Sequence, residues 1–85
     1  MLKVFYWSVC PHCKKAIKFL RDRGIPFVAL DIERQPPKVV EKVIDVNGGE
    51  DWVAPTLEYK GKWCAGEAFD ADTFEQRLKS LGVIS

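Results

Sequence analysis

The spacing of apolar and polar residues changes along the chain. Some segments have the spacing of a strand, and the segments between them have the spacing of a helix. The apolar run Val4-Phe5-Tyr6-Trp7 predicts a first strand at about residues 2–7. Beyond it, apolar positions recur every three or four residues, which predicts a helix with Cys10 as N-cap, Pro11 at its first position and Gly24 as its stop. The inner face of this helix is Cys13, Ala16, Ile17 and Leu20, and its outer face is Lys14, Lys15, Lys18, Arg21 and Arg23.

A second strand and a second helix follow. Residues 27–32 are nearly continuously apolar, which predicts a strand buried on both faces. Pro36-Pro37 opens a helix that ends at Asn47-Gly48-Gly49, although its many β-branched residues resist helix formation. The apolar residues of this helix at i, i+4 spacing are Val39, Val40, Val43 and Ile44.

The last third of the chain predicts a hairpin and a final helix. Residues 56–59 and 62–65 form two strands that turn on Lys60-Gly61. Asp70 is the N-cap of a helix that stops at Gly82. Its inner stripe is Phe74, Leu78 and Leu81. The predicted order is therefore β-α-β-α-β-β-α.

Composition indicates one small domain, residues 1–85, with 47% hydrophobic residues and a formal charge of +1. This balance gives no argument for a nucleic-acid partner, and no apolar run is long enough for a bilayer. The first residues enter the first strand without the features of a secretory leader, and three cysteines is an odd number. We therefore expect a monomer in a reducing, cytoplasmic setting.

The main candidate for chemistry is Cys10-Pro11-His12-Cys13 at the start of the first helix. A helix N-terminus stabilises negative charge, so we expect Cys10 to be an exposed, easily ionised nucleophile. Cys13 lies one turn inside and faces the core, where it would act as the shielded resolving thiol. We expect an exposed His12 to modulate the Cys10 thiolate. This arrangement predicts a redox enzyme.

The element order, with a C-x-x-C motif after the first strand and an X-Pro before the third, resembles the thioredoxin fold, and most closely the glutaredoxins. The resemblance extends over essentially the whole chain. The matching features are Cys10-Pro11-His12-Cys13, Gly24-Ile25-Pro26-Phe27, Val53-Ala54-Pro55 and Gly66. It implies an α/β, thioredoxin-like fold with a four-stranded mixed sheet and three helices on its two faces. It also implies a thiol–disulfide oxidoreductase that reduces protein or glutathione-mixed disulfides.

The same resemblance assigns roles around the thiols. Pro55 would be a cis proline that turns the Ala54 backbone toward the active site to pair with a bound peptide or glutathione. Val53 and Gly66 would belong to this substrate-binding surface. Trp7 stands where glutaredoxins usually carry a basic residue that meets the glutathione carboxylate. The acidic residues that glutaredoxins often carry after the fourth strand stand at shifted positions within residues 65–70 of this chain.

These departures predict weak use of glutathione and a preference for protein partners. Trp7, Trp52 and Val53 would offer them apolar area beside the thiols. We expect disulfide-containing proteins as substrates, and glutathione or a flavin-dependent reductase as electron donor. No tightly bound cofactor is expected.

Other uses of the cysteines stay open at this point. Cys10 and Cys13 could hold zinc with His12 or Cys64, or an iron–sulfur cluster bridged between two chains, which would make the chain a carrier. The chain shows no second ligand pair, so we expect no metal. A binding module with a structural disulfide is a third alternative. Cys64 is predicted to be a buried hydrophobe, and Asp70 a helix cap rather than a glutathione contact.

Overall fold

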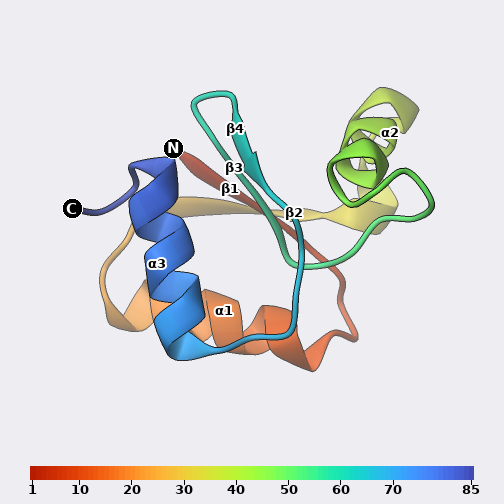
Figure 1. Ribbon diagram of the computed structural model, residues 1–85. Coiled ribbons are helices and arrows are strands. Elements are labelled where there is room, and N and C mark those ends of the chain that lie inside the picture. The colour runs from red at the N-terminus through yellow and green to blue at the C-terminus, as the bar shows by residue number, and fades with distance from the viewer.

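The computed structural model describes residues 1–85, and its elements follow the predicted order (Figure 1). They are β1 (Leu2–Tyr6), α1 (Pro11–Asp22), β2 (Phe27–Asp31), α2 (Pro37–Val46), β3 (Thr56–Tyr59), β4 (Lys62–Cys64) and α3 (Ala71–Leu81). A 3-10 turn, η1 (Ile32–Arg34), was not predicted; it begins where the Asp31 carboxylate accepts the Glu33 N–H. The predicted second strand ends one residue early as a result.

The four strands form one mixed sheet in the order β2-β1-β3-β4. β1 runs parallel to β2, with Val4 opposite Ala29, and antiparallel to β3, with Val4 opposite Leu57. β3 and β4 form the predicted hairpin. β1 and β3 are therefore central, and β2 and β4 are the edges.

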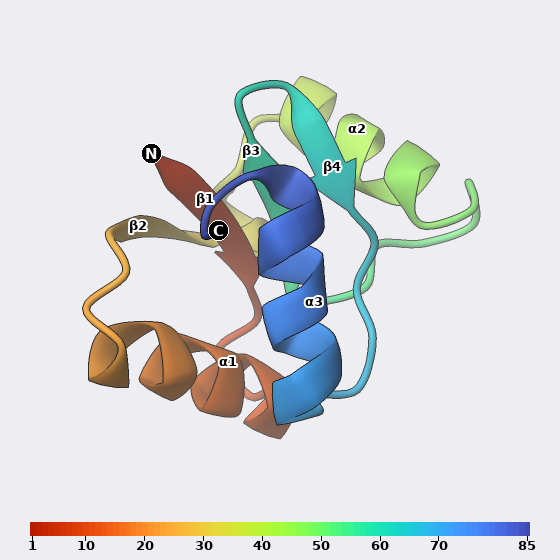
Figure 2. The ribbon, with the colours of Figure 1, turned by 60° about the vertical axis from the view of Figure 1, so that its left-hand side comes forward.

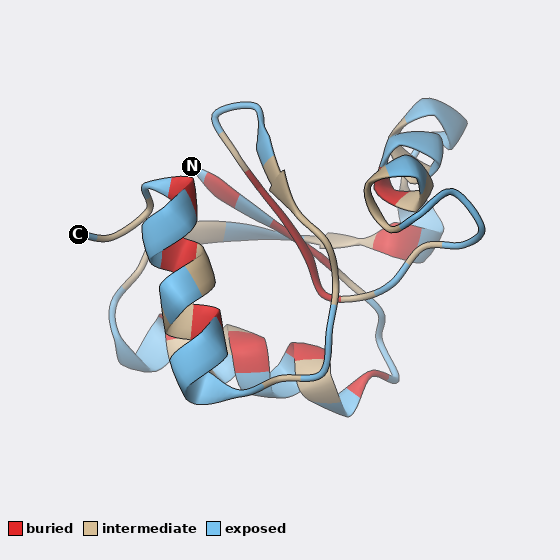
Figure 3. Cartoon of the chain, viewed as in Figure 1, coloured by how far each residue is buried: buried red, intermediate tan, exposed pale blue.

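Alternation along β1 divides the core into two layers. Leu2 and Val4 face α1 and α3, whereas Phe5 faces α2 on the opposite side of the sheet (Figure 2). The larger cluster is Leu2, Val4, Ala16, Leu20, Leu57, Phe74, Leu78 and Leu81. The smaller is Phe5, Ile32 and Val43. In Figure 3 the buried segments accordingly lie on the central strands and on the inner faces of the helices.

The helix ends agree with the predicted signals. Cys10 is the N-cap of α1, and the Asp70 carboxylate accepts the Thr73 N–H at 3.0 Å to cap α3. This backbone hydrogen bond lowers the pKa of Asp70. Gly82 ends α3 with φ +85°, in the left-handed region that favours glycine. None of these helices has the length and apolar character that crossing a bilayer requires.

The prediction that the second strand is buried on both faces is wrong. Val28 is 41% exposed, and Ala29 is also exposed. The reason is topological, because β2 lies at the sheet edge and the helices on the two faces cover it incompletely. An apolar run predicts a strand, but it does not predict the position of that strand in a sheet.

Candidate active site

Cys10 lies in the turn between β1 and α1, between two backbone groups. Its Sγ accepts the Cys13 N–H at 3.2 Å, and its thiol donates to the Ala54 carbonyl oxygen at 3.7 Å. The residue is only 8% exposed, so the expectation of an exposed nucleophile is wrong. The Ala54 segment of the loop before β3 lies against the sulfur, which chain position alone does not reveal. The Cys13 N–H would remain to stabilise a thiolate at Cys10.

Cys13 is more deeply placed than Cys10, as its position on the inner face of α1 predicts. It is 1% exposed. Burial, together with a hydrogen bond to Cys10, raises the pKa of the Cys13 thiol to about 12. Both cysteines are free thiols in this structure. The two thiols therefore differ in environment: Cys10 keeps a small exposed fraction and contacts the Ala54 backbone, whereas Cys13 is a neutral, fully desolvated group behind it.

The predicted cis peptide bond is present between Ala54 and Pro55. Its loop is held by Thr56, which is completely buried and donates through Oγ1 to the Val53 carbonyl oxygen at 2.5 Å. The Ala54 carbonyl thus faces Cys10 from a segment whose next residues are fixed in β3.

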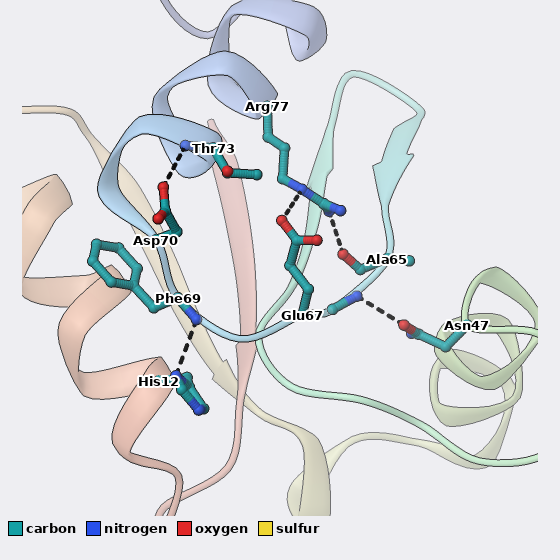
Figure 4. A network of polar contacts seen from close by, with 9 residues as sticks. His12, Asn47, Ala65, Glu67, Phe69, Asp70, Thr73 and Arg77 are labelled. Atoms are coloured by element: carbon teal, nitrogen blue, oxygen red, sulfur yellow. Dashed lines mark hydrogen bonds and ion pairs between the residues drawn. The ribbon is translucent and has the colours of Figure 1, made fainter.

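Asn47 connects this loop with the segment after β4, and sequence reasoning missed it. Its side-chain amide donates to the Thr56 Oγ1 at 2.9 Å and to the Val43 carbonyl oxygen at 2.8 Å. Its Oδ1 accepts the Gly66 N–H at 2.7 Å (Figure 4). Asn47 was assigned only to the end of α2. An asparagine after a helix has this hydrogen-bonding capacity, but nothing in the spacing identifies its distant partners.

Gly66 packs directly on the Val53 backbone. A Cβ at Gly66 would lie 2.7 Å from Val53 Cγ1 and 2.8 Å from the Val53 carbonyl oxygen. Its φ is not in the left-handed region, so what this position requires is space rather than conformational freedom. The structure therefore places Gly66 directly against Val53.

His12 differs from its prediction. It is half-buried, and its Nδ1 accepts the Phe69 N–H at 3.0 Å (Figure 4). The segment between β4 and α3 lies across the first turn of α1, which removes His12 from full solvent. The ring therefore anchors the segment through an acceptor nitrogen.

The same segment is held from α3 by Arg77. Its guanidinium donates to the Ala65 carbonyl oxygen at 2.5 Å and pairs with Glu67 at 2.7 Å. These residues line a small pocket that Pro55 and Asp70 also border. The two acids that stand at shifted positions in this segment both have partners within the chain. Glu67 pairs with Arg77, and Asp70 caps α3.

Apolar side chains lie in the turn that carries Cys10 and in the loop whose Ala54 carbonyl faces it. Trp7 is 37% exposed and packs edge-to-face with Trp52, with ring centroids 5.7 Å apart. The Trp7 carbonyl accepts the Cys10 N–H at 3.1 Å, so Trp7 belongs to the turn that carries the thiol. Val9 and Val53 are exposed as well, so four apolar residues flank the site.

Cys64 lies outside this group. It is half-buried against the larger core cluster, less enclosed than predicted, because β4 is an edge strand. The structure contains no group of three or more His, Cys, Asp or Glu side chains placed to hold a metal ion.

Comparison with known proteins agrees with the fold. A family model described as glutaredoxin matches residues 2–62. A glutaredoxin (grx-1) from Archaeoglobus fulgidus superposes with a TM-score of 0.66 at 28% identity, over 94% of this chain and 83% of that one. A wheat glutaredoxin is similar in fold, with a TM-score of 0.60 at 22% identity, over 96% and 73% of the two chains. No curated protein sequence matched. The match over residues 2–62, together with this fold, shows that the chain belongs to the glutaredoxin family.

Proposed function

We propose that the chain reduces disulfides by dithiol exchange through Cys10 and Cys13, and that its main substrates are proteins. The observation that carries this proposal is the position of the Cys10 Sγ, between the Cys13 N–H and the Ala54 carbonyl. One group favours the thiolate, and the other is a backbone edge to which a substrate segment could pair. Membership of the glutaredoxin family supports the same reaction class.

The exchange has two steps. The Cys10 thiolate attacks one sulfur of a substrate disulfide, which forms a mixed disulfide and releases the other sulfur as a thiolate that takes up a proton. Cys13 then gives up its proton and attacks the Cys10 Sγ, which breaks the mixed disulfide and releases the second substrate thiol. The chain is left with a Cys10–Cys13 disulfide. Two electrons from an external thiol or dithiol donor restore it.

Burial gives the two thiols an order of action. At neutral pH the raised pKa of Cys13 keeps it protonated, so it does not compete with Cys10 for the incoming disulfide. Its attack becomes productive once the mixed disulfide holds the Cys10 sulfur beside it. Cys10 is therefore the nucleophile and Cys13 the resolving thiol in this proposal.

The surroundings favour protein substrates over glutathione. Trp7 places an indole where glutaredoxins usually carry a cation for the glutathione carboxylate, and the exposed Val53 adds apolar area next to Ala54. Glu67 is already paired with Arg77. Each missing charge-assisted contact costs glutathione affinity, whereas apolar area suits a protein surface. Glutathione and a flavin-dependent reductase are the two classes of donor to compare.

Turnover of a small disulfide with a dithiol donor by the purified protein and three serine variants tests this proposal. Cys10→Ser should abolish turnover. Cys13→Ser should lose dithiol exchange but still form a mixed disulfide, detectable by mass spectrometry. Cys64→Ser, the matched control, should retain activity. Equal activity of Cys10→Ser and the unmodified protein would refute the assignment. Stoichiometric metal or cluster on the purified protein without turnover would favour the carrier alternative.

A further inference from the structure

A groove of about 460 Å³ lies between α1 and the edge strand β2, and neither Cys10 nor Cys13 lines it. Ala29 pairs with Val4 and therefore lies on the side of the sheet that α1 covers. Its methyl group is too small to fill the space beneath the helix, and it is exposed. In Figure 2, β2 is the outermost strand above α1. The small side chain at this edge leaves the groove open.

The wall that α1 contributes is basic. Lys14, Lys18 and Arg21 recur at helical spacing and line the groove, as does Asp22. Asp22 is engaged by Lys18 at 2.6 Å, whereas no carboxylate pairs with Lys14 or Arg21. Two cations of the lining thus remain free to meet an acidic ligand.

Positive charge is concentrated along α1 and the residue that follows it. Residues 14–23 hold five cations and one carboxylate, a formal +4, whereas the whole chain carries only +1. All other residues together therefore carry −3. A nearly neutral composition conceals a polarised surface, and its positive part begins one turn after Cys10. Such a field orients an acidic partner with that end toward the thiols.

The opposite wall is a strand with a free edge. β2 pairs only with β1, so the backbone groups on its outer side have no partner within the sheet. An extended peptide can pair with such an edge, and its alternate side chains then face the adjoining helix. A nucleic acid offers no such backbone, and the −3 on the rest of the molecule would repel it.

We propose that this groove binds an extended, acidic polypeptide segment. Bound there, the segment would lie along β2 with its carboxylates toward Lys14 and Arg21. That the segment belongs to a protein exchanging electrons with Cys10 rests on the function proposed above. The binding itself does not.

Fluorescence anisotropy with the reduced, full-length protein tests this binding. The probe is a labelled, cysteine-free decapeptide of alternating Glu and Thr. It should bind, and its affinity should fall as salt rises. Arg21→Glu should weaken binding at least about tenfold, equivalent to about 1.4 kcal/mol. Lys62→Glu, the same charge change on the other edge strand, should change it less than about twofold. Ala29→Phe should weaken binding without any change of charge.

Three results would overturn the proposal. One is equal affinity for a peptide of alternating Lys and Thr, and another is an equal effect of Arg21→Glu and Lys62→Glu. The third is tighter binding of a single-stranded oligonucleotide that Arg21→Glu abolishes. Turnover of a small disulfide separates the two hypotheses. Normal turnover without peptide binding would refute the proposed binding groove but not the proposed function. Peptide binding without turnover would refute the proposed function but not the groove.

Discussion

The Gly66 N–H donates to the Asn47 Oδ1 at 2.7 Å, a contact that joins the end of α2 to the segment after β4 across 19 positions of sequence. The same amide reaches Thr56, whose hydroxyl holds the Val53 carbonyl. One asparagine therefore joins the end of α2, the loop before β3 and the segment after β4. This relationship explains how the Ala54 carbonyl is kept beside Cys10 although it lies outside any strand.

Asn47→Ala should lower both stability and activity. It removes three hydrogen bonds and leaves the Gly66 N–H without a partner, at a cost of about 1–3 kcal/mol. KM for a protein disulfide should rise more than kcat falls, because the Ala54 backbone loses its support. Chemical denaturation and steady-state kinetics measure the two effects. Asp45→Ala, an exposed position in the same turn, is the control. Equal unfolding free energies for the two variants would contradict this role.

Gly66→Ala should destabilise the fold through overpacking. The added methyl would meet the Val53 side chain and backbone at 2.7–2.9 Å, and relieving such contacts costs about 1–3 kcal/mol. The shift of Val53 should also reduce turnover. Val53→Ala in the same chain removes only the side-chain part of the clash, so partial rescue is expected in the double variant. Full stability in Gly66→Ala alone would show that the segment moves freely.

Stability of the reduced protein should fall at alkaline pH because of Cys13. Its pKa is raised from 9.0 to about 12 in the folded state, so folding favours the neutral thiol. This contribution is fully present below about pH 9 and is lost as pH rises toward 12, with a slope of at most about 1.4 kcal/mol per pH unit. Cys13→Ser should lack this decline in denaturant titrations at each pH. If the unfolding free energies of the two proteins fall in parallel as pH rises, burial of the Cys13 thiol is not the cause.

His12→Ala should release the segment between β4 and α3. Loss of the acceptor for the Phe69 N–H removes about 1 kcal/mol of local stability, which corresponds to about fivefold faster amide exchange at Phe69. Exchange followed by NMR measures it residue by residue. Lys15→Ala, on the exposed side of the same helix, should leave the Phe69 amide unchanged. If exchange at Phe69 is the same in both variants, His12 does not anchor this segment.

Trp7→Lys should improve glutathione use. With one disulfide substrate, we expect turnover with glutathione to be at least about tenfold below turnover with a protein-type reductase, a gap of about 1.4 kcal/mol. A lysine at this position supplies a cation for the glutathione carboxylate, so the difference in turnover between the two donors should become smaller. Trp7→Leu removes the indole without adding charge and should not narrow it. Efficient glutathione turnover by the unmodified protein, unimproved by the lysine, would contradict this prediction.

The sequence by itself determined the order of the helices and strands and the ends of the helices. Hydrophobic spacing, Pro11, Asp70 and Gly82 are local signals, because a cap or a helical face depends on neighbours within one or two turns. The C-x-x-C spacing likewise placed both thiols at one helix end. The element order, the separation of Cys13 into the core and the family resemblance all followed from such short-range patterns.

Only the tertiary structure decided what lies across from these elements. The exposure of Ala29 depends on β2 being an edge strand, and the partial burial of Cys10 and His12 depends on loops about 44 and 57 positions away. Asn47 acquires its role through Thr56 and Gly66 for the same reason. Contacts of this kind arise from how packed layers bring distant loops together, and neither residue type nor local spacing encodes which loops meet.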